Sequence, residues 1–175
     1  MSWEARYVRV IVEGGHRAFF DRFVEAHEVT TLVLVSPWVA GTGEHRSQLE
    51  VVARKIERDS IATWLLTRHP DREPVNRPAL ELLSSLPTVK TFFNNELHAK
   101  VYVCRCDPFG FAYVGSANLT GRAMTAYEVG VMVDGKGEGE RIVEELERVG
   151  TVDLLNRAGT SEGLEYHRMR EETSE

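Results

Sequence analysis

The sequence predicts an α/β fold, with a mixed, largely parallel sheet flanked by helices on both faces. Two observations support this prediction. Strand-like segments alternate with amphipathic helical segments along the first half of the chain, which is typical of strand-helix-strand units. Later strand-like segments follow one another through a short turn, which indicates a hairpin. At 175 residues the chain is the size of one domain with a full core.

Each element has its own signal. Runs rich in β-branched and aromatic residues predict strands over 7–12, 31–36, 61–67, 88–93, 97–103, 111–114 and 127–133. Apolar residues at helical spacing predict two helices between the early strands, the first with Phe19, Phe20, Phe23 and Val24, the second with Leu49, Val52, Ala53 and Ile56. Further helices are expected over about 77–85 and 140–149. We interpret the phenylalanines as core residues rather than as a partner-binding stripe.

The segment 97–103 carries an imidazole and an ammonium two residues apart, at His98 and Lys100. Because alternate side chains of a strand share a face, these two are expected to point the same way. The next strand is expected to return through a turn at 107–110 and to deliver Gly115 and Ser116 to its end. Asn118 then falls where a short helix is expected to start, a position that favours phosphate binding.

A carboxylate completes the set. Glu128 lies on the predicted strand 127–133, which can bring it beside His98. A carboxylate bonded to one imidazole nitrogen fixes the tautomer and raises the basicity of the other nitrogen. Together these side chains are suited to binding and cleaving a phosphodiester without a metal.

This pattern of His-x-Lys, Gly-Ser-x-Asn and a later Glu resembles the phospholipase D superfamily, over roughly residues 92–134. The resemblance implies a phospholipase D-like catalytic domain, which we expect over 1–157, followed by a polar C-terminal tail over 158–175. It implies that His98 is the nucleophile, that Lys100 and Asn118 clamp the phosphate, that Ser116 supports the site and that Glu128 orients His98.

One position departs from the family pattern. The family has an Asp seven residues after the His, and this chain has Arg105 there. The hairpin that follows is three residues longer than the family spacing. Two alternatives follow: either Asp107 takes the place of the family Asp through the enlarged turn, or that carboxylate is missing and activity is impaired. In the family this Asp supports the fold more than the chemistry.

The chain contains a single His-x-Lys motif among six histidines, whereas the chemistry needs a nucleophile on one side of phosphorus and a general acid on the other. Family members with one motif pair two identical chains. The resemblance therefore implies a homodimer with one shared site and a phosphohistidine intermediate, and no metal or other cofactor. Two imidazoles sharing one proton would titrate as a coupled pair.

The substrate is expected to be nucleic acid, either DNA or RNA. Loops after two strands bring Arg46, Arg68, Arg72 and Arg77 to the expected rim of the site, and Arg122 follows the Gly-Ser turn. As a set these residues favour nucleic acid, because Trp38 can stack on a base and Gly115 allows the backbone to approach the substrate. Taken singly, each arginine is interpreted as a solvated loop charge and Trp38 as a buried loop anchor. The net charge of −6 argues against avid, general binding but permits a local basic groove.

Three activities remain open from the sequence. The first is an endonuclease, alone or within a restriction or defence complex. The second is a phosphodiesterase or transferase acting on a phospholipid or small molecule, although no amphipathic membrane-binding surface is evident. The third is a catalytically impaired nucleic-acid-binding module. The sequence shows no membrane-spanning run and no signal peptide, so we expect a cytoplasmic protein. Cys104 and Cys106 are interpreted as buried thiols rather than half of a metal site.

Overall fold

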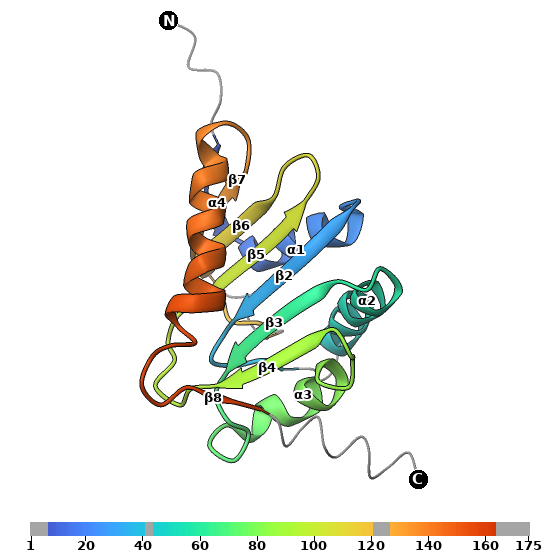
Figure 1. The fold of residues 1–175 in the computed structure, drawn as a ribbon, viewed down its shortest axis with the longest axis vertical. Coiled ribbons are helices and arrows are strands. Elements are labelled where there is room, and N and C mark those ends of the chain that lie inside the picture. The colour runs from blue at the N-terminus through green and yellow to red at the C-terminus, as the bar shows by residue number, and fades with distance from the viewer. Residues whose placement is uncertain (1–6, 41–43, 121–126, 164–175) are drawn as a thin grey trace, which may run out of the picture.

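The computed structural model describes residues 7–40, 44–120 and 127–163, with the backbone alone for 44–47. Its strands form one sheet in the order β1-β7-β6-β5-β2-β3-β4-β8 (Figure 1). The strands are β1 (Val8–Glu13), β2 (Val29–Val35), β3 (Ala62–Thr67), β4 (Val89–Phe93), β5 (Val101–Cys106), β6 (Phe111–Gly115), β7 (Tyr127–Asp134) and β8 (Ser161–Glu162). The helices are α1 (Gly15–Glu25), α2 (Glu44–Arg58), α3 (Arg77–Leu83) and α4 (Glu138–Arg148), with a 3₁₀ turn η1 (Pro74–Asn76) and a π-helical turn η3 (Val149–Asp153).

The predicted mixed α/β architecture is confirmed, but the expectation that parallel pairs dominate is corrected. Only β2-β3 and β3-β4 pair in parallel, and the other five neighbouring pairs of described strands are antiparallel. The reason lies in the connections. Helical crossovers through α2 and α3 return the chain to the same edge of the sheet, whereas the short turn between β5 and β6 reverses its direction.

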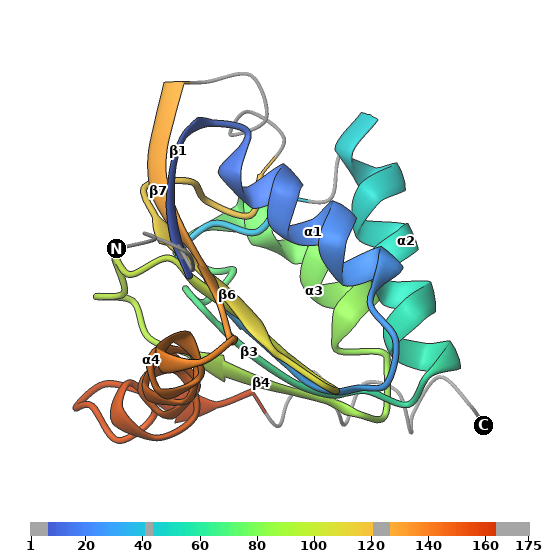
Figure 2. The same cartoon turned by 90° about the horizontal axis from the view of Figure 1, so that it is seen from above.

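Helices cover both faces of the sheet, as predicted. Figure 2 shows α1, α2 and α3 on one face and α4 on the other. The larger core lies under α1, α2 and α3, where Phe19, Phe20 and Phe23 are fully buried, so their interpretation as core residues is confirmed. Val24, on the same predicted stripe, is 38% exposed. The smaller core lies under α4 and includes Val143.

The strand predicted over 97–103 begins only at Val101. Its neighbours end at this point, since Val101 pairs with Val35 at the last residue of β2 and with Val114, one residue before β6 ends. Residues 97–100 therefore have no strand beside them to extend the ladder, although the Lys100 carbonyl still accepts a hydrogen bond from the Gly115 amide, with an N to O distance of 3.3 Å.

The C-terminal part of the described chain also joins the sheet. Residues 161 and 162, in the stretch expected to be a polar tail, form β8 and pair with the edge strand β4. Asn94 strengthens this contact by donating its side-chain amide to Thr160 Oγ1, at 2.8 Å. Within the described ranges, no helix combines the length and the apolar character needed to cross a bilayer.

Candidate active site

The motif residues lie at one edge of the sheet, next to the ends of several strands. The carboxyl ends of β2, β3 and β6 lie at this edge, together with the amino ends of β5 and β7. Because ligands of open α/β sheets bind beyond strand ends, this edge is the expected place for a site.

His98 and Lys100 lie side by side, as their spacing predicts. Lys100 Nζ is 3.3 Å from His98 Nδ1 and donates a hydrogen bond to the His98 carbonyl oxygen at 2.7 Å. The two side chains differ in access to solvent: His98 is exposed, whereas Lys100 is only 7% exposed. The imidazole of His98 is therefore accessible to an incoming group, and the neighbouring ammonium of Lys100 is partly desolvated.

The ammonium of Lys100 lies close to other groups that favour an anion. Its nitrogen is 5.9 Å from the centroid of the Trp38 ring, and the guanidinium carbon of Arg68 is 4.9 Å from the same centroid. Burial is the main cause that lowers the pKa of Lys100, the positive charge of Arg68 lowers it further, and Glu128 opposes the shift. Two cations held near one another are stabilised when an anion binds between them.

Arg68 is fixed by its own partners. Its Nε donates to the Leu97 carbonyl at 3.0 Å, and its Nη1 pairs with Glu73 at 2.9 Å. Hydrogen bonds from Trp38 and then Arg68 hold the pKa of Glu73 below its usual range. The structure thus brings Trp38 and Arg68, both predicted to bind substrate, to the predicted catalytic pair.

The Gly-Ser-x-Asn turn is tied to the sheet from both sides. Tyr102 donates its hydroxyl to the Ala117 carbonyl at 2.8 Å. Ser36 Oγ accepts the Leu119 amide at 3.0 Å and donates to the Trp38 carbonyl at 2.7 Å. Ser36 therefore links the turn to the Trp38 loop, and it is a positioning residue that the motifs in the sequence do not reveal.

Asn118 lies within this turn, and its amide oxygen is buried without a hydrogen-bond partner in the described part of the chain. The helix expected at Asn118 does not begin there, because residues 116–120 are irregular and Leu119 forms a parallel bridge with Val39. Any helix over 121–126 lies outside the described residues, and so does Arg122.

Ser116 and Glu128 form a second pair at the candidate site. Ser116 Oγ donates a short hydrogen bond to a Glu128 carboxylate oxygen and also accepts the Val129 amide at 3.1 Å. Among the described residues no hydrogen bond joins Glu128 to His98, the partner that the sequence analysis expected for it. In this structure Glu128 is held by the serine.

No contact in the described part of the chain joins the remaining predicted arginines to His98 or Lys100. Arg77 is exposed and pairs with Asp71 at 3.2 Å. The backbone of Arg72 bonds to the His69 carbonyl, in a turn after β3. The side chain of Arg46 is not among those described. The described basic rim is therefore Lys100 and Arg68.

Arg105 lies at the far end of β5, about 16 Å from Lys100 at a rise of roughly 3.3 Å per residue. Its guanidinium approaches two carboxylates of α4, with Nη2 3.6 Å from Glu144 and Nε 3.4 Å from Glu147. Asp107 is exposed in the turn beyond it. Arg105 therefore fastens α4 to the sheet, and neither Arg105 nor Asp107 reaches the site.

Replacing Arg105 by Asp, the family residue, is expected to destabilise the protein by about 2 kcal/mol. The new carboxylate would lie next to those of Glu144 and Glu147, and the three negative charges would repel one another. Catalysis should be unchanged, since the position is remote from the site. Thermal unfolding measures the first effect and a turnover assay the second. Arg148→Asp provides a matched control, because Arg148 pairs with Asp153 at 2.8 Å on the more exposed end of α4. A gain in activity for the Arg105 variant would contradict this assignment.

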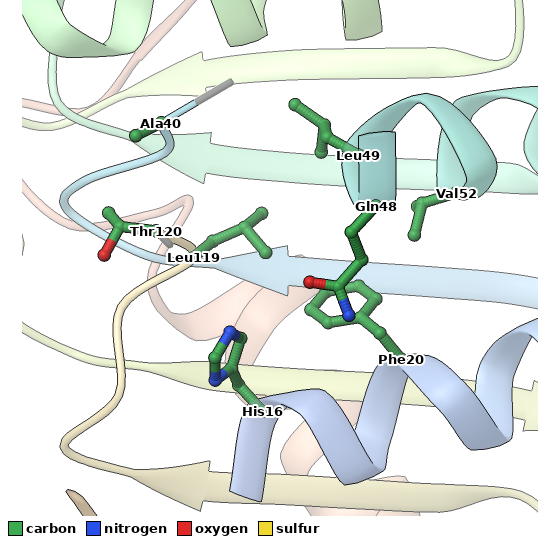
Figure 3. Close-up of a pocket in the computed structure, with 8 residues that line it drawn as sticks. All are labelled: His16, Phe20, Ala40, Gln48, Leu49, Val52, Leu119 and Thr120. Carbon is green, nitrogen blue, oxygen red and sulfur yellow. The ribbon is translucent and has the colours of Figure 1, made fainter. Parts of the chain in front are cut away.

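A small cavity lies near the turn that follows β6, and Leu119 forms part of its wall (Figure 3). It is formed where α1 and α2 approach the end of the turn, and its volume of about 20 Å³ has room for about one water molecule. It is lined by His16, Phe20, Ala40, Gln48, Leu49, Val52, Leu119 and Thr120. None of the predicted site residues lines it.

The two cysteines are unpaired and lie on the same face of β5, Cys104 buried and Cys106 partly so. This agrees with their interpretation as thiols of the core. Within the described ranges, no group of three or more His, Cys, Asp or Glu side chains is placed to hold a metal ion.

Comparison with known proteins gives structural but no sequence relatives. The chain matches no protein-family profile and no curated sequence. It superposes on the phospholipase D family member Nuc from Salmonella typhimurium with a TM-score of 0.57 and 13% identity, over 89% of this chain and 97% of Nuc. It superposes on NucT from Helicobacter pylori with a TM-score of 0.54 and 14% identity, over 81% and 93% of the two chains.

A larger enzyme shares the same fold. Phosphatidylserine synthase from Haemophilus influenzae superposes with a TM-score of 0.58 and 13% identity, over 92% of this chain and 41% of the synthase. Identities of this size establish the fold alone. The sheet, its helices and the edge that carries His98 and Lys100 thus identify the described chain as having the phospholipase D fold.

Proposed function

We propose that this protein is a metal-independent phosphodiesterase, an endonuclease that hydrolyses DNA or RNA through a phosphohistidine at His98. The observation that carries the proposal is the buried ammonium of Lys100 beside the exposed imidazole of His98. Among the described residues Lys100 has no acidic ion-pair partner, and Arg68 lies close enough to lower its pKa. This arrangement supports an anion site next to a nucleophile.

The reaction begins when neutral His98 attacks phosphorus in line with the leaving oxygen. A P–N bond forms, the P–O bond to the leaving group breaks, and a protonated His98 of a second copy donates its proton to that oxygen. The second imidazole then takes a proton from water, which attacks phosphorus and releases His98. Lys100 and Asn118 of each copy stabilise the charge on the equatorial oxygens.

Two copies are required because one chain supplies one motif histidine. The exposure of His98 supports a shared site, since a buried imidazole would not meet its counterpart across a two-fold axis. In the resting structure Glu128 accepts a hydrogen bond from Ser116. To orient His98, the Glu128 carboxylate would release Ser116 and accept a hydrogen bond from the imidazole of His98 instead.

Nucleic acid is favoured as the substrate by the environment of Lys100. Trp38 presents an indole ring beside the two cations, and stacking on an aromatic ring beside a phosphate contact is a common way to hold single-stranded nucleic acid. The chain would work in the cytoplasm, where its two free thiols remain reduced, alone or as part of a restriction or defence complex.

The direct test is cleavage of single-stranded DNA, double-stranded DNA and RNA by purified protein in excess EDTA. We expect cutting that resists the chelator. Cleavage that appears only with added metal would overturn the proposed chemistry. No cleavage of any nucleic acid, with turnover of phospholipid vesicles or a small phosphodiester, would replace the nuclease by a lipid or small-molecule phosphodiesterase. Retained nucleic-acid binding with no turnover would indicate an impaired binding module.

A further inference from the structure

Exposed apolar side chains gather on β1 and on the start of β7. In the described ranges ten large apolar side chains are exposed, and five of them lie on these two strands, whereas the other five lie at five separate places. The open patch, as we call the group, consists of Val8, Val10, Val12, Tyr127 and Val129, with exposed fractions of 38%, 65%, 58%, 87% and 57%. Single exposed apolar residues are ordinary, but a contiguous group of them points to an interaction surface.

The open patch is the part of the sheet that α4 does not cover. Val10 pairs with Val131, so the β1 side chain lies on the same face as the alternate residues of β7. On β7 that face passes from Val133, buried in the core under α4, to Val129 and Tyr127, which are exposed. The helices α1, α2 and α3 lie on the opposite face (Figure 2). The apolar face of the sheet therefore continues beyond the helix that covers it.

Sheet twist turns the open patch toward the candidate site. Neighbouring strands rotate by roughly 20–25°, so the rotation over the five steps from β3 to β1 is about 100° or more. The face of β1 consequently looks roughly along the direction in which β3 runs. In Figure 2 the open face of β1 and β7 is on the left, and so is the segment 94–100, which links β4 to β5 and carries His98. The open patch and His98 thus lie on the same side of the molecule.

The open patch is also close to the reacting groups, because Tyr127 and Val129 flank Glu128 on β7. The Val129 amide donates to Ser116 Oγ at 3.1 Å. Neighbouring strands lie about 4.8 Å apart, so β7 is about 10 Å and β1 about 14 Å from β5, the strand that His98 precedes. A standard protein interface buries about 800 Å² on each partner, which corresponds to a disc of about 16 Å radius. An interface centred on His98 therefore includes the open patch.

The charges around the open patch disfavour an anionic partner. Its five side chains are uncharged, and Glu13, which pairs with Tyr127 at the end of β1, is acidic. Arg9 pairs with Met132 and so belongs to the opposite face of the sheet. An acidic neighbour repels the phosphates of nucleic acid and an anionic lipid surface alike. The patch is therefore suited to an apolar protein surface.

We propose that the open patch is a surface on which a second copy of this chain packs, about a two-fold axis that passes beside His98. The inference rests on the proposed function, which needs the His98 of a second copy because one chain supplies one motif histidine. The axis repeats the contact, so two open patches flank the shared site. Burial of their valines and tyrosines stabilises the pair, and the pair holds two imidazoles at one phosphate.

The test is the oligomeric state of the full chain, measured by sedimentation velocity over a range of protein concentrations. We expect a parent dimer whose dissociation constant rises at least about tenfold in Val10→Lys and in Tyr127→Ala. Both variants should stay folded, which thermal unfolding checks, because lysine is well tolerated on an edge strand and Tyr127 is 87% exposed. Val24→Lys is the matched control, since Val24 is 38% exposed on α1, on the other face of the sheet.

Three results would overturn the proposal. The first is a parent protein that is monomeric at every concentration tested. The second is a parent dimer whose dissociation constant is unchanged in both patch variants, or rises equally in Val24→Lys. The third is a parent that does not dimerise but binds vesicles of phosphatidylcholine, with binding lost in Val10→Lys, which would replace the second copy by a lipid surface.

Activity separates the failure of this inference from the failure of the proposed function. In a parent that cleaves nucleic acid, turnover per chain of Val10→Lys should fall at low protein concentration and return to the parent value above the new dissociation constant. Turnover that stays low while the dimer re-forms would mean that the substitution damages the site itself, and would overturn the inference. If the parent dimer cleaves nothing, the proposed function fails, whereas sedimentation of the variants still decides whether the copies meet at the open patch.

Discussion

His98→Ala is expected to abolish turnover, with kcat reduced by about 10³-fold or more, because no other described side chain can take over attack on phosphorus. The protein should remain folded, since His98 is exposed and, among the described residues, the hydrogen-bond contact of its side chain is with Lys100 Nζ. Cleavage of a labelled oligonucleotide measures the first effect, and thermal unfolding measures the second. His27→Ala is a matched control, because His27 is also exposed and lies before β2, away from the site.

The same variant tests the shared site. When His98→Ala chains are mixed equally with parent chains and allowed to exchange, about a quarter of the dimers contain two intact histidines. A site that needs both copies should then show about a quarter of the parent activity. Activity near one half would mean that each chain works alone, and cleavage by pure His98→Ala would refute the phosphohistidine scheme altogether.

The sequence was most informative where the signal is local. Period-two and helical spacing locate seven of the eight strands and the four α-helices that the structure describes, because such patterns depend on neighbouring residues alone. The strand β8 was missed because two residues, Ser161 and Glu162, are too few to form a pattern. The dominance of antiparallel pairs was also missed, since β5 lies beside β2 through contacts that no spacing in the sequence records.

The candidate site shows the same difference between features that depend on neighbouring residues and features that depend on distant ones. His98 and Lys100 are close in sequence, so strand geometry predicts their proximity correctly. The pairing of Glu128 with Ser116 depends on how β6 and β7 align, and no local pattern favours Ser116 over His98 as the partner of Glu128. The partners of Arg105 lie on α4, about 40 residues further along the chain, so the sequence left its role open.

Supporting residues were the hardest to anticipate. Ser36 and Tyr102 are ordinary strand residues in the sequence, and their contacts with the Gly-Ser-x-Asn turn appear only in three dimensions. Motifs therefore identified the reacting groups, whereas the structure was needed to find what holds them.

Lys100→Met is expected to lower kcat/KM by about 10²-fold to 10³-fold, because it removes the charge that stabilises the equatorial oxygens while leaving a side chain of similar length. The matched control is Lys90→Met. Lys90 Nζ lies 5.9 Å from the Trp64 ring centroid, as Lys100 does from Trp38, but it is exposed on β4. Equal losses in the two variants would show that the effect is not specific to the site.

Stability should change in the opposite direction to activity. Burial lowers the pKa of Lys100 in the folded protein below that in the unfolded chain. At pH values below the folded-state pKa, Lys100 is charged in both states, so the cost of burying the ammonium is fully present; it declines as pH rises through that pKa. Lys100→Met should therefore unfold at a higher temperature than the parent at neutral pH, with a gain that shrinks under alkaline conditions. If Lys100→Met is both inactive and less stable at neutral pH, the ammonium supports the fold. If it is inactive but more stable, the ammonium is a charge that the protein keeps, at a cost in stability, in order to bind a phosphate.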